Sequence, residues 1–514
     1  MGSMLGVAVA SAVAATLVKA GSPVAVAKVR PAATIFVPNG PGSASIAAAG
    51  PVCHFLCYSP AQLQQAYDFP TGDHAPTGAG QTIVVVTAFG SPTLEADLAA
   101  FDAAFNVPST TLAYCGAPNV GSTDPGANFG WGPETSADVE YAHAMAPGAQ
   151  IVLVVSPTDN TVDMAATEAA CLPKYPGAIV SQSFGEDETD VSDPAIAAAF
   201  DSFHSTYAAA TAAGGTLIAS AGDFGATGFT GTNVVAEYPS SDPLVTAVGG
   251  TEGSPYPGGL IQAVSPDTHG NNDGNNGGNN NGGNHDGSNN GNNNANQGNN
   301  HGKHGTSGKH RNTKNNDSGS AYGGEQVWNE SDTLGIATGG APSILFKTPA
   351  YQQGVNGSAW RTTADVAYDA AAQGGEAVIW NGRLGVFAGT SIGSPHWAAI
   401  VALANELRSH QDSIGQLNPA LYAIAADRER YSNDFHDITQ GNNAYLPGPG
   451  FSAGPGYDLP TGLGTPDVAN LISDLANSGS HHHDQGNSQR EDNGGGYGGG
   501  NGNTGHDHQS IQVG

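Results

Sequence analysis

Ser391 stands in the stretch FAGTSIGSPHWAAI (residues 387–400), with a proline four residues later and an apolar, alanine-rich run behind it. The run predicts a helix that begins close to the serine. A serine hydroxyl becomes an effective nucleophile when a neighbouring base accepts its proton. The first question is therefore which side chain could act as that base.

Histidine is the usual partner of a nucleophilic serine, but the histidines of this chain are poorly placed. His396 lies five residues after Ser391 on the same predicted helix, so we expect it to pack or to face solvent rather than to act across a cleft. Ten of the seventeen histidines fall in two Asn/Gly-rich tracts without strand or helix patterns. These tracts could bind metal weakly, but a solvated polar role is the simpler interpretation.

Two carboxylates are better placed. Glu134 and Asp138 lie in WGPETSADVEYAHAMAPGAQIVLVV (131–155), which predicts a helix running into a strand. A spacing of four residues puts both on one helical face, where like charges repel. One explanation is a shared proton, with one carboxylate acting as base and the other orienting it. The other is that both stand near a helix start, where the dipole favours anions. The spacing alone leaves both open.

The elements that would position these residues follow an α/β pattern. Short β-branched runs such as QTIVVVTAFG (81–90), QIVLVVSP (150–157) and GTLIASAGD (215–223) alternate with helical stretches such as residues 193–215. Continuous apolar strands of this kind predict a mostly parallel central sheet with helices on both faces. Functional residues gather at the carboxyl ends of the strands in such sheets.

With three motifs in place, the sequence resembles the sedolisin family, the serine-carboxyl peptidases. ETSADVE matches the family's Glu-x-x-x-Asp helix, SAGDFGATG (220–228) a strand-end segment, and GTSIGSP the nucleophile segment. The three occur in the family's chain order, and the resemblance covers roughly residues 57–475 apart from 266–320. It implies a subtilisin-like α/β fold. It also implies four catalytic residues. Ser391 would be the nucleophile and Glu134 the general base. Asp138 would orient that base, and Asp223 would stabilise the oxyanion.

The expected function is that of an acid-active serine-carboxyl endopeptidase that cleaves proteins or peptides through an acyl-enzyme on Ser391. A glutamate with an ordinary pKa of about 4.3 serves as base only where it is ionised. A neutral Asp223 could donate a hydrogen bond to an oxyanion, whereas an ionised Asp223 would repel it. Alternatives are a tripeptidyl-type exopeptidase of the same family and a non-catalytic surface or binding protein.

The charge balance bears on partners. Lys and Arg number 15 against 45 Asp and Glu, a formal net charge of -30. We therefore expect no nucleic acid partner and no stable membrane association. The net negative charge would shrink in acid as carboxylates take up protons. We expect a monomer.

A second candidate site lies near the C-terminus. NDFHDITQGNN (433–443) and SAGPGYDLPTGLGTPD (452–467) combine hard oxygen ligands with glycines that let carbonyls converge, as calcium prefers. An ordinary Gly/Pro loop is the alternative. The resemblance implies one structural Ca²⁺ ion, with the middle three ligands acting through main-chain carbonyls. Its ligands would be Asp437, Ile438, Gly454, Gly456 and Asp458.

Composition divides the chain into a possible signal segment (1–27), an N-terminal extension without an evident full propeptide (28–54), a peptidase domain (55–476) and a low-complexity tail (477–514). The apolar run 5–17 and the A-x-A pattern at 25–27 favour export, so we expect a secreted protein. The tract 266–320 is almost wholly Asn, Gly, His and Ser, which predicts a disordered insertion.

Four cysteines, Cys53, Cys57, Cys115 and Cys171, are even in number and lack paired C-x-x-C spacing. This favours disulfides or inert thiols over a zinc site. The sequence leaves the pairing open.

Overall fold

The structure is a computed structural model that describes residues 28–31, 35–38, 57–116, 130–256, 322–408 and 413–478. The chain divides into two compact units, residues 1–263 with 321–514 and residues 264–320. Only the first unit contains described residues. The predicted signal segment, the Asn/Gly-rich insertion and nearly all of the predicted tail lie outside the described residues.

An eight-stranded sheet forms the centre of the first unit, in the order β12-β11-β9-β7-β4-β6-β5 with β15 also paired to β11. All of its pairings are parallel except that of β12 with β11. The strands are β4 (Thr82–Ala88), β5 (Ala113–Cys115), β6 (Gln150–Ser156), β7 (Ile179–Gln182), β9 (Thr216–Ser220), β11 (Val245–Gly253), β12 (Glu325–Val327) and β15 (Val366–Asp369).

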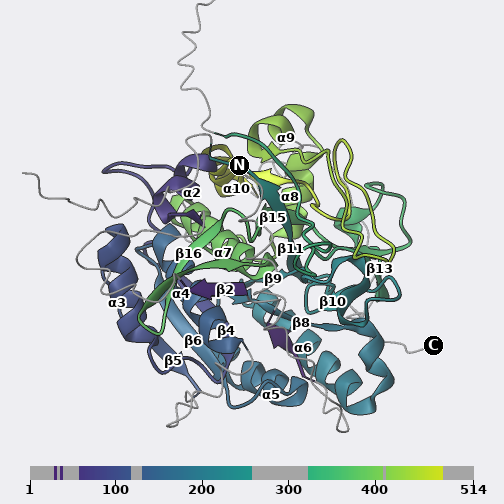
Figure 1. The fold of residues 1–514 in the computed structure, drawn as a ribbon, viewed down its shortest axis with the longest axis horizontal. Helices are drawn as coiled ribbons and strands as arrows, with labels where there is room; N and C mark the ends of the chain where they lie inside the picture. The colour runs from purple at the N-terminus through teal and green to yellow at the C-terminus, as the bar shows by residue number, and fades with distance from the viewer. Residues whose placement is uncertain are drawn as a thin grey trace, which may run out of the picture. The chain divides into compact units, whose positions relative to one another are not determined.

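Helices cover both faces of this sheet, as Figure 1 shows. Alternate residues of β4 enter different cores: Val85 packs in the cluster that includes residues of α4 (Trp131–Met145) and α7 (Gly393–Leu407). Its neighbour Val86 packs in the cluster with residues of α5 (Thr161–Cys171) and α6 (Pro194–Ala212). Because successive side chains of a strand point to opposite faces of the sheet, both faces of the central sheet are buried. The predicted fold class is confirmed.

The helix starts follow local chemistry. The Asn160 side chain accepts hydrogen bonds from the first backbone N–H groups of α5, and Asp193 does the same for α6, where Pro194 occupies the first helical position. Capping of this kind fixes the residue at which each helix begins.

The other helices are α2 (Pro60–Ala66), α3 (Leu94–Phe105), α8 (Asn418–Ala425), α9 (Arg428–Asp434) and α10 (Val468–Asn477). The short 3₁₀ segments are η4 (Leu172–Lys174), η5 (Glu188–Ser192), η6 (Gly225–Thr230), η7 (Ala350–Gln352) and η8 (Thr390–Ile392).

Smaller sheets surround the main one. β1 (Arg30–Pro31) and β10 (Glu237–Tyr238) flank β8 (Phe184–Asp187), and β2 (Ile35–Pro38), β17 (Arg383–Ala388), β16 (Gly375–Trp380) and β3 (Cys57–Tyr58) form a four-stranded sheet. In Figure 1 the purple strand β2 is surrounded by elements from much later in the sequence. Two further pairs are β13 (Pro342–Lys347) with β14 (Trp360–Thr362) and β18 (Phe435–His436) with β19 (Thr465–Pro466).

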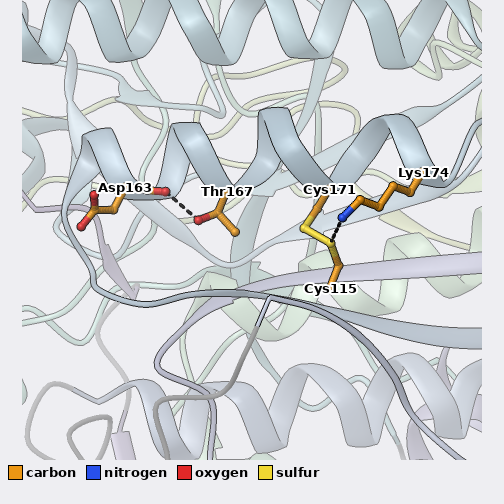
Figure 2. Close-up of a disulfide and its surroundings, with 5 residues drawn as sticks. All are labelled: Cys115, Asp163, Thr167, Cys171 and Lys174. Atoms are coloured by element: carbon orange, nitrogen blue, oxygen red, sulfur yellow. Dashed lines mark hydrogen bonds between the residues drawn. A yellow bond between two sulfur atoms is a disulfide. The ribbon is translucent and has the colours of Figure 1, made fainter.

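A disulfide joins Cys115, the last residue of β5, to Cys171, the last residue of α5 (Figure 2). The Lys174 ammonium lies 3.1 Å from the Cys115 sulfur. The bond closes a loop of 56 residues that contains the whole of α4. By loop-closure entropy a loop of this length contributes about 4 kcal/mol to stability. Cys57 is disulfide-bonded as well, so the prediction of disulfides is confirmed.

Candidate active site

The four residues expected to be catalytic come from three places around the sheet. Glu134 and Asp138 lie in the first half of α4, and Asp223 follows the carboxyl end of β9. Ser391 lies in η8, between β17 and the start of α7. Their relative exposures are 0%, 0%, 0% and 1%, respectively. Packing of α4 and β9 against η8 gathers these buried polar groups at one end of the parallel strands.

A serine that sequence reasoning did not single out joins two of them. The Ser183 hydroxyl lies 2.7 Å from Oδ1 of Asp138 and 3.0 Å from the main-chain oxygen of Ser391. Ser183 follows the last residue of β7 and is fully buried. Asp138 and the nucleophile segment are thus linked through a single hydroxyl.

Asp223 is tied to the same segment by the residue before Ser391. The backbone N–H and the hydroxyl of Thr390 both donate to Oδ1 of Asp223, at 2.8 and 2.6 Å. The Thr390 hydroxyl in turn accepts from the N–H of Gly222 at 3.2 Å. These hydrogen bonds hold the Asp223 carboxyl next to the Ser391 segment. Two donors contact its Oδ1.

Two glycines make the close approach possible. Gly389 has φ of 130°, a conformation open mainly to glycine, and it turns the chain from β17 into η8. Gly222 has φ of 104°, and a Cβ there would come within 2.3 Å of Oε1 of Glu237. The sharp turn before Ser391 and the tight packing before Asp223 therefore both depend on the absence of a side chain.

The electrostatics of the acid pair follow from burial. Burial raises the pKa of Asp138 well above its ordinary value, and the hydrogen bond from Ser183 opposes that rise. Glu134 stands in the first turn of α4, where the helix dipole favours a negative charge. Burial thus favours a proton on Asp138, and the position of Glu134 at the start of the helix fits its assignment as the base.

His396 does not take part. Its ring lies between those of Tyr141 and Tyr368, with centroid distances of 4.9 and 4.1 Å. Its Nδ1 lies 2.7 Å from the main-chain oxygen of Ile392, and burial lowers its pKa to about 3. Packing, one of the two roles expected for it, is confirmed.

A second group of carboxyls lies next to the site. Glu237 is buried, its carboxyl is close enough to Asp187 and Asp223 for both to raise its pKa, and burial is the largest cause of that rise. Arg30 of β1 opposes it, and its guanidinium lies 4.7 Å from the centre of the Phe229 ring. The N-terminal segment thus brings a cation to an acidic region beside the site.

The residues expected to bind calcium are also brought together. The N–H of Gly456 donates to both oxygens of Asp437, at 3.1 and 3.0 Å, and the N–H of Gly454 donates to Asp458 at 3.0 Å. Ile438 is buried. Within the described part of the chain, no cluster of three or more His, Cys, Asp or Glu side chains could hold a metal. A cation here would therefore need main-chain oxygens as well.

Two residues of the site were not predicted from the sequence, Ser183 and Thr390. Ser183 lies in IVSQSFGE, where it directly follows a buried strand, and strand ends were already expected to carry function. Thr390 is the residue before the nucleophile. Their positions in the sequence could have pointed to the site, but a serine or a threonine by itself does not indicate a functional role.

This arrangement defines a class of protein: an α/β protein with a subtilisin-like parallel sheet and a buried serine set among carboxyls. No family model matches the chain. The structure of sedolisin from Pseudomonas, a serine-carboxyl proteinase complexed with pseudo-iodotyrostatin, superposes with a TM-score of 0.62 at 24% identity, covering 83% of this chain and 99% of that one. This likeness shows the fold.

Sequence relatives narrow the class. Kumamolisin from Bacillus sp. (strain MN-32) is 29% identical over 441 residues, covering 82% of this chain and 64% of its own. Sedolisin from Pseudomonas sp. (strain 101) is 36% identical over 170 residues, covering 32% of this chain and 28% of its own. Together these findings support a sedolisin-family, subtilisin-like protein. The chain spans less than two thirds of the length of either relative.

Proposed function

We propose that the protein is a serine-carboxyl peptidase that hydrolyses peptide bonds through an acyl-enzyme on Ser391. One observation carries the proposal: buried carboxyls from two separate elements are hydrogen-bonded to the segment that holds Ser391, Asp138 through Ser183 and Asp223 through Thr390. The only histidine on the neighbouring helix α7 is packed between two tyrosines. His396 is therefore not placed to act as the base, and carboxyls are the groups linked to the Ser391 segment.

In the proposed mechanism, ionised Glu134 accepts the Ser391 hydroxyl proton as Oγ attacks the substrate carbonyl carbon. Asp138, in its protonated form, orients Glu134. Asp223, in its protonated form, donates a hydrogen bond to the oxyanion of the tetrahedral intermediate. Glu134 then gives its proton to the leaving amine, and the acyl-enzyme remains. A water molecule, deprotonated by Glu134, hydrolyses the acyl-enzyme and restores the serine.

An acid pH optimum follows from the opposite demands on these carboxyls. Glu134 must be ionised, which fails when the pH drops well below its pKa. Asp138 and Asp223 must keep their protons, which fails as the pH rises. Burial favours the protonated form of Asp138, so the working range lies between these limits.

Endopeptidase activity is the leading form of the proposal. A tripeptidyl exopeptidase is the second candidate, because β1 pairs with Gly185 and Phe184, directly after Ser183, and takes up part of the chain edge beside the nucleophile. A peptidase named tripeptidyl-peptidase sed1, from Aspergillus fumigatus, is 38% identical over 120 residues. Mass spectrometry of digests separates the two: internal cuts indicate an endopeptidase, and successive N-terminal tripeptides indicate the exopeptidase.

We also propose one structural calcium ion in the C-terminal loops. Burial raises the pKa of Asp458 to about 6, and the nearby Asp437 carboxylate adds to the rise. Two facing carboxylates in glycine-rich loops fit a hard cation, which would relieve their repulsion. Asp437 and Asp458 would supply charge, and main-chain oxygens of Ile438, Gly454 and Gly456 the remaining ligands. The ion would join the two loops and have no part in the chemistry.

Export from the cell is the proposed localisation. Its support is the signal-like N-terminal segment and the disulfide between Cys115 and Cys171, since disulfides persist mainly in oxidising compartments. No described helix combines the length and the apolar character needed to cross a bilayer.

The test is cleavage of an unfolded protein substrate by the wild type and by Ser391→Ala, in parallel, at pH about 4 and about 7, on either side of much of the carboxyl titration. We expect cleavage only by the wild type and only in acid. Cleavage by Ser391→Ala would disprove the nucleophile. Circular dichroism of both proteins shows whether a lack of cleavage reflects a lack of folding.

A further inference from the structure

Ser183 occupies a position that no catalytic step described above uses. Its hydroxyl is buried between an acid on α4 and the main chain of η8, at 2.7 Å from Oδ1 of Asp138 and 3.0 Å from the Ser391 carbonyl oxygen. Oδ2 of Asp138 has no hydrogen-bond partner within the described residues. The Ser183 side chain therefore links the orienting acid to the nucleophile segment.

We propose that Ser183 is a positioning residue. Through it, the protonation state of Asp138 determines how firmly the Ser391 main chain is held in place. The inference rests on the proposed function and deepens it. Ser183 does not touch the reacting atoms. It acts through Asp138 on one side and through the carbonyl of the nucleophile on the other.

The physical reason is that a hydroxyl carries one proton and can donate it to one acceptor at a time. When Asp138 is neutral, its Oδ1 is a weaker acceptor than a carboxylate oxygen, so the Ser183 hydroxyl donates to the Ser391 carbonyl instead. When Asp138 is ionised, Ser183 donates to the carboxylate. The Ser391 carbonyl then faces the oxygen of Ser183 without a proton between them, an unfavourable contact at 3.0 Å. The nucleophile segment is thus held best in the protonation state that catalysis requires.

Other titratable groups near α4 have their own partners. The Glu140 carboxylate on α4 accepts from the Ile379 N–H, and His143 Nε2 lies 2.6 Å from the Pro108 carbonyl. On the packed elements, Asp97 of α3 accepts from the N–H groups of Asn381 and Gly382, Asp102 of α3 lies 3.6 Å from His143, and His396 of α7 lies 3.5 Å from Glu376 of β16. Glu134, one turn before Asp138, is the nearest acid on the same face.

The direction of the pKa effect agrees with this geometry. The hydrogen bond from Ser183 lowers the pKa of Asp138, against the larger raising effect of burial. Removal of the hydroxyl therefore raises the pKa of Asp138 further, and the loss of activity on the alkaline side moves to higher pH.

The experiment compares the wild type with Ser183→Ala, Ser183→Thr and Ser181→Ala. Ser181 is the matched control, because it is a buried serine of β7, two residues before Ser183, whose hydroxyl contacts Ser394 at 2.9 Å instead of Asp138. For Ser183→Ala we expect kcat to fall about 10- to 100-fold with little change in KM, as for a misplaced nucleophile. Its alkaline limb moves to higher pH, and Ser183→Thr restores both properties in part.

A second readout does not need activity. Carboxyl ¹³C titration of aspartate-labelled protein, with Asp138→Asn to assign the signal, gives the pKa of Asp138 directly. We expect a higher value in Ser183→Ala and an unchanged value in Ser181→Ala. An unchanged Asp138 titration in Ser183→Ala, or a loss of kcat no larger than that of Ser181→Ala, would overturn the proposal. If the wild type cleaves no peptide, the proposed function fails, and the titration alone decides whether Ser183 controls Asp138.

Discussion

Glu134–Asp138 and Arg361–Asp365 are both buried pairs of ionisable residues four positions apart, and they are built in opposite ways. Arg361 donates to both oxygens of Asp365, which also accepts from the Ala247 N–H and the Tyr422 hydroxyl at 2.8 Å each. Asp138 accepts a hydrogen bond from Ser183 at Oδ1, and its Oδ2 has no partner among the described residues.

The difference teaches how to separate a structural acid from a chemical one. A carboxylate that is neutralised and surrounded by donors has no capacity left for proton transfer, because every change in its protonation costs several interactions. A buried carboxyl with an acid neighbour and few donors keeps a movable proton. Spacing in the sequence cannot distinguish the two, whereas the partners in the fold can.

The largest expected effect tests the chemical pair. Ser391→Ala and Glu134→Gln should each lower kcat by roughly 10⁴-fold or more, since a nucleophile and its base act as a unit. Stability should change little. Glu140→Gln is the matched control, a buried glutamate of the same helix that accepts from the Ile379 N–H, and it should keep its activity per folded molecule. Steady-state kinetics at acid pH provide the measurement. If Glu134→Gln retained activity, the Glu134–Asp138 pair would not be a chemical pair, and its contrast with Arg361–Asp365 would fail.

The next effect tests the structural pair. Arg361→Met leaves the Asp365 charge buried without its partner, so the free energy of unfolding should fall by about 3–5 kcal/mol. Denaturant unfolding measures this change, and the double variant Arg361→Met/Asp365→Leu should recover much of it. Asp138→Asn should lose little stability, because it removes no ion pair. A loss below about 1 kcal/mol in Arg361→Met would show that Asp365 does not depend on its cation.

A pH effect sharpens the comparison. Burial raises the pKa values of three consecutive acids of β8 and η5, Glu186 to about 7, Asp187 to about 6 and Glu188 to about 7. The folded state therefore holds protons that the unfolded chain releases near its ordinary value of about 4, so stability must fall as the pH rises from about 4 to about 7. The midpoint of thermal unfolding should fall over this range, and Glu188→Gln should flatten the dependence. A midpoint that rises towards neutral pH would contradict it.

The smallest effect concerns a third pair of acids, Asp437 and Asp458, for which calcium would take the part that Arg361 plays for Asp365. Removal of calcium with a chelator should lower stability by about 3 kcal/mol if the ion was present at 100 times its dissociation constant. Calorimetry before and after readdition of Ca²⁺ measures this, with Mg²⁺ as the control ion. Asp437→Asn should abolish the response. An equal response to both ions would argue against a calcium-selective site.

Sequence reasoning reached the fold because the patterns are local. The alternation of β-branched runs with alanine-rich helices predicted β4, β6 and α6 close to their observed bounds. The spacing of Glu134 and Asp138 predicted a shared helical face. Ser183 could not be predicted as a bridge, because its partners lie 45 and 208 residues away along the chain. Links of that kind depend on how β7, α4 and η8 pack, which no short pattern encodes.

The short strand β2 has a consequence for how the chain folds. It pairs antiparallel with β17, so Ile35 lies opposite Ala388 and Pro38 opposite Gly385. During synthesis the residues of β2 leave the ribosome long before their partner exists, and they must stay unpaired until nearly the whole domain has been made. Contacts of such high sequence separation form late and slowly. Completion of the edge next to Ser391 is therefore expected among the last events of folding.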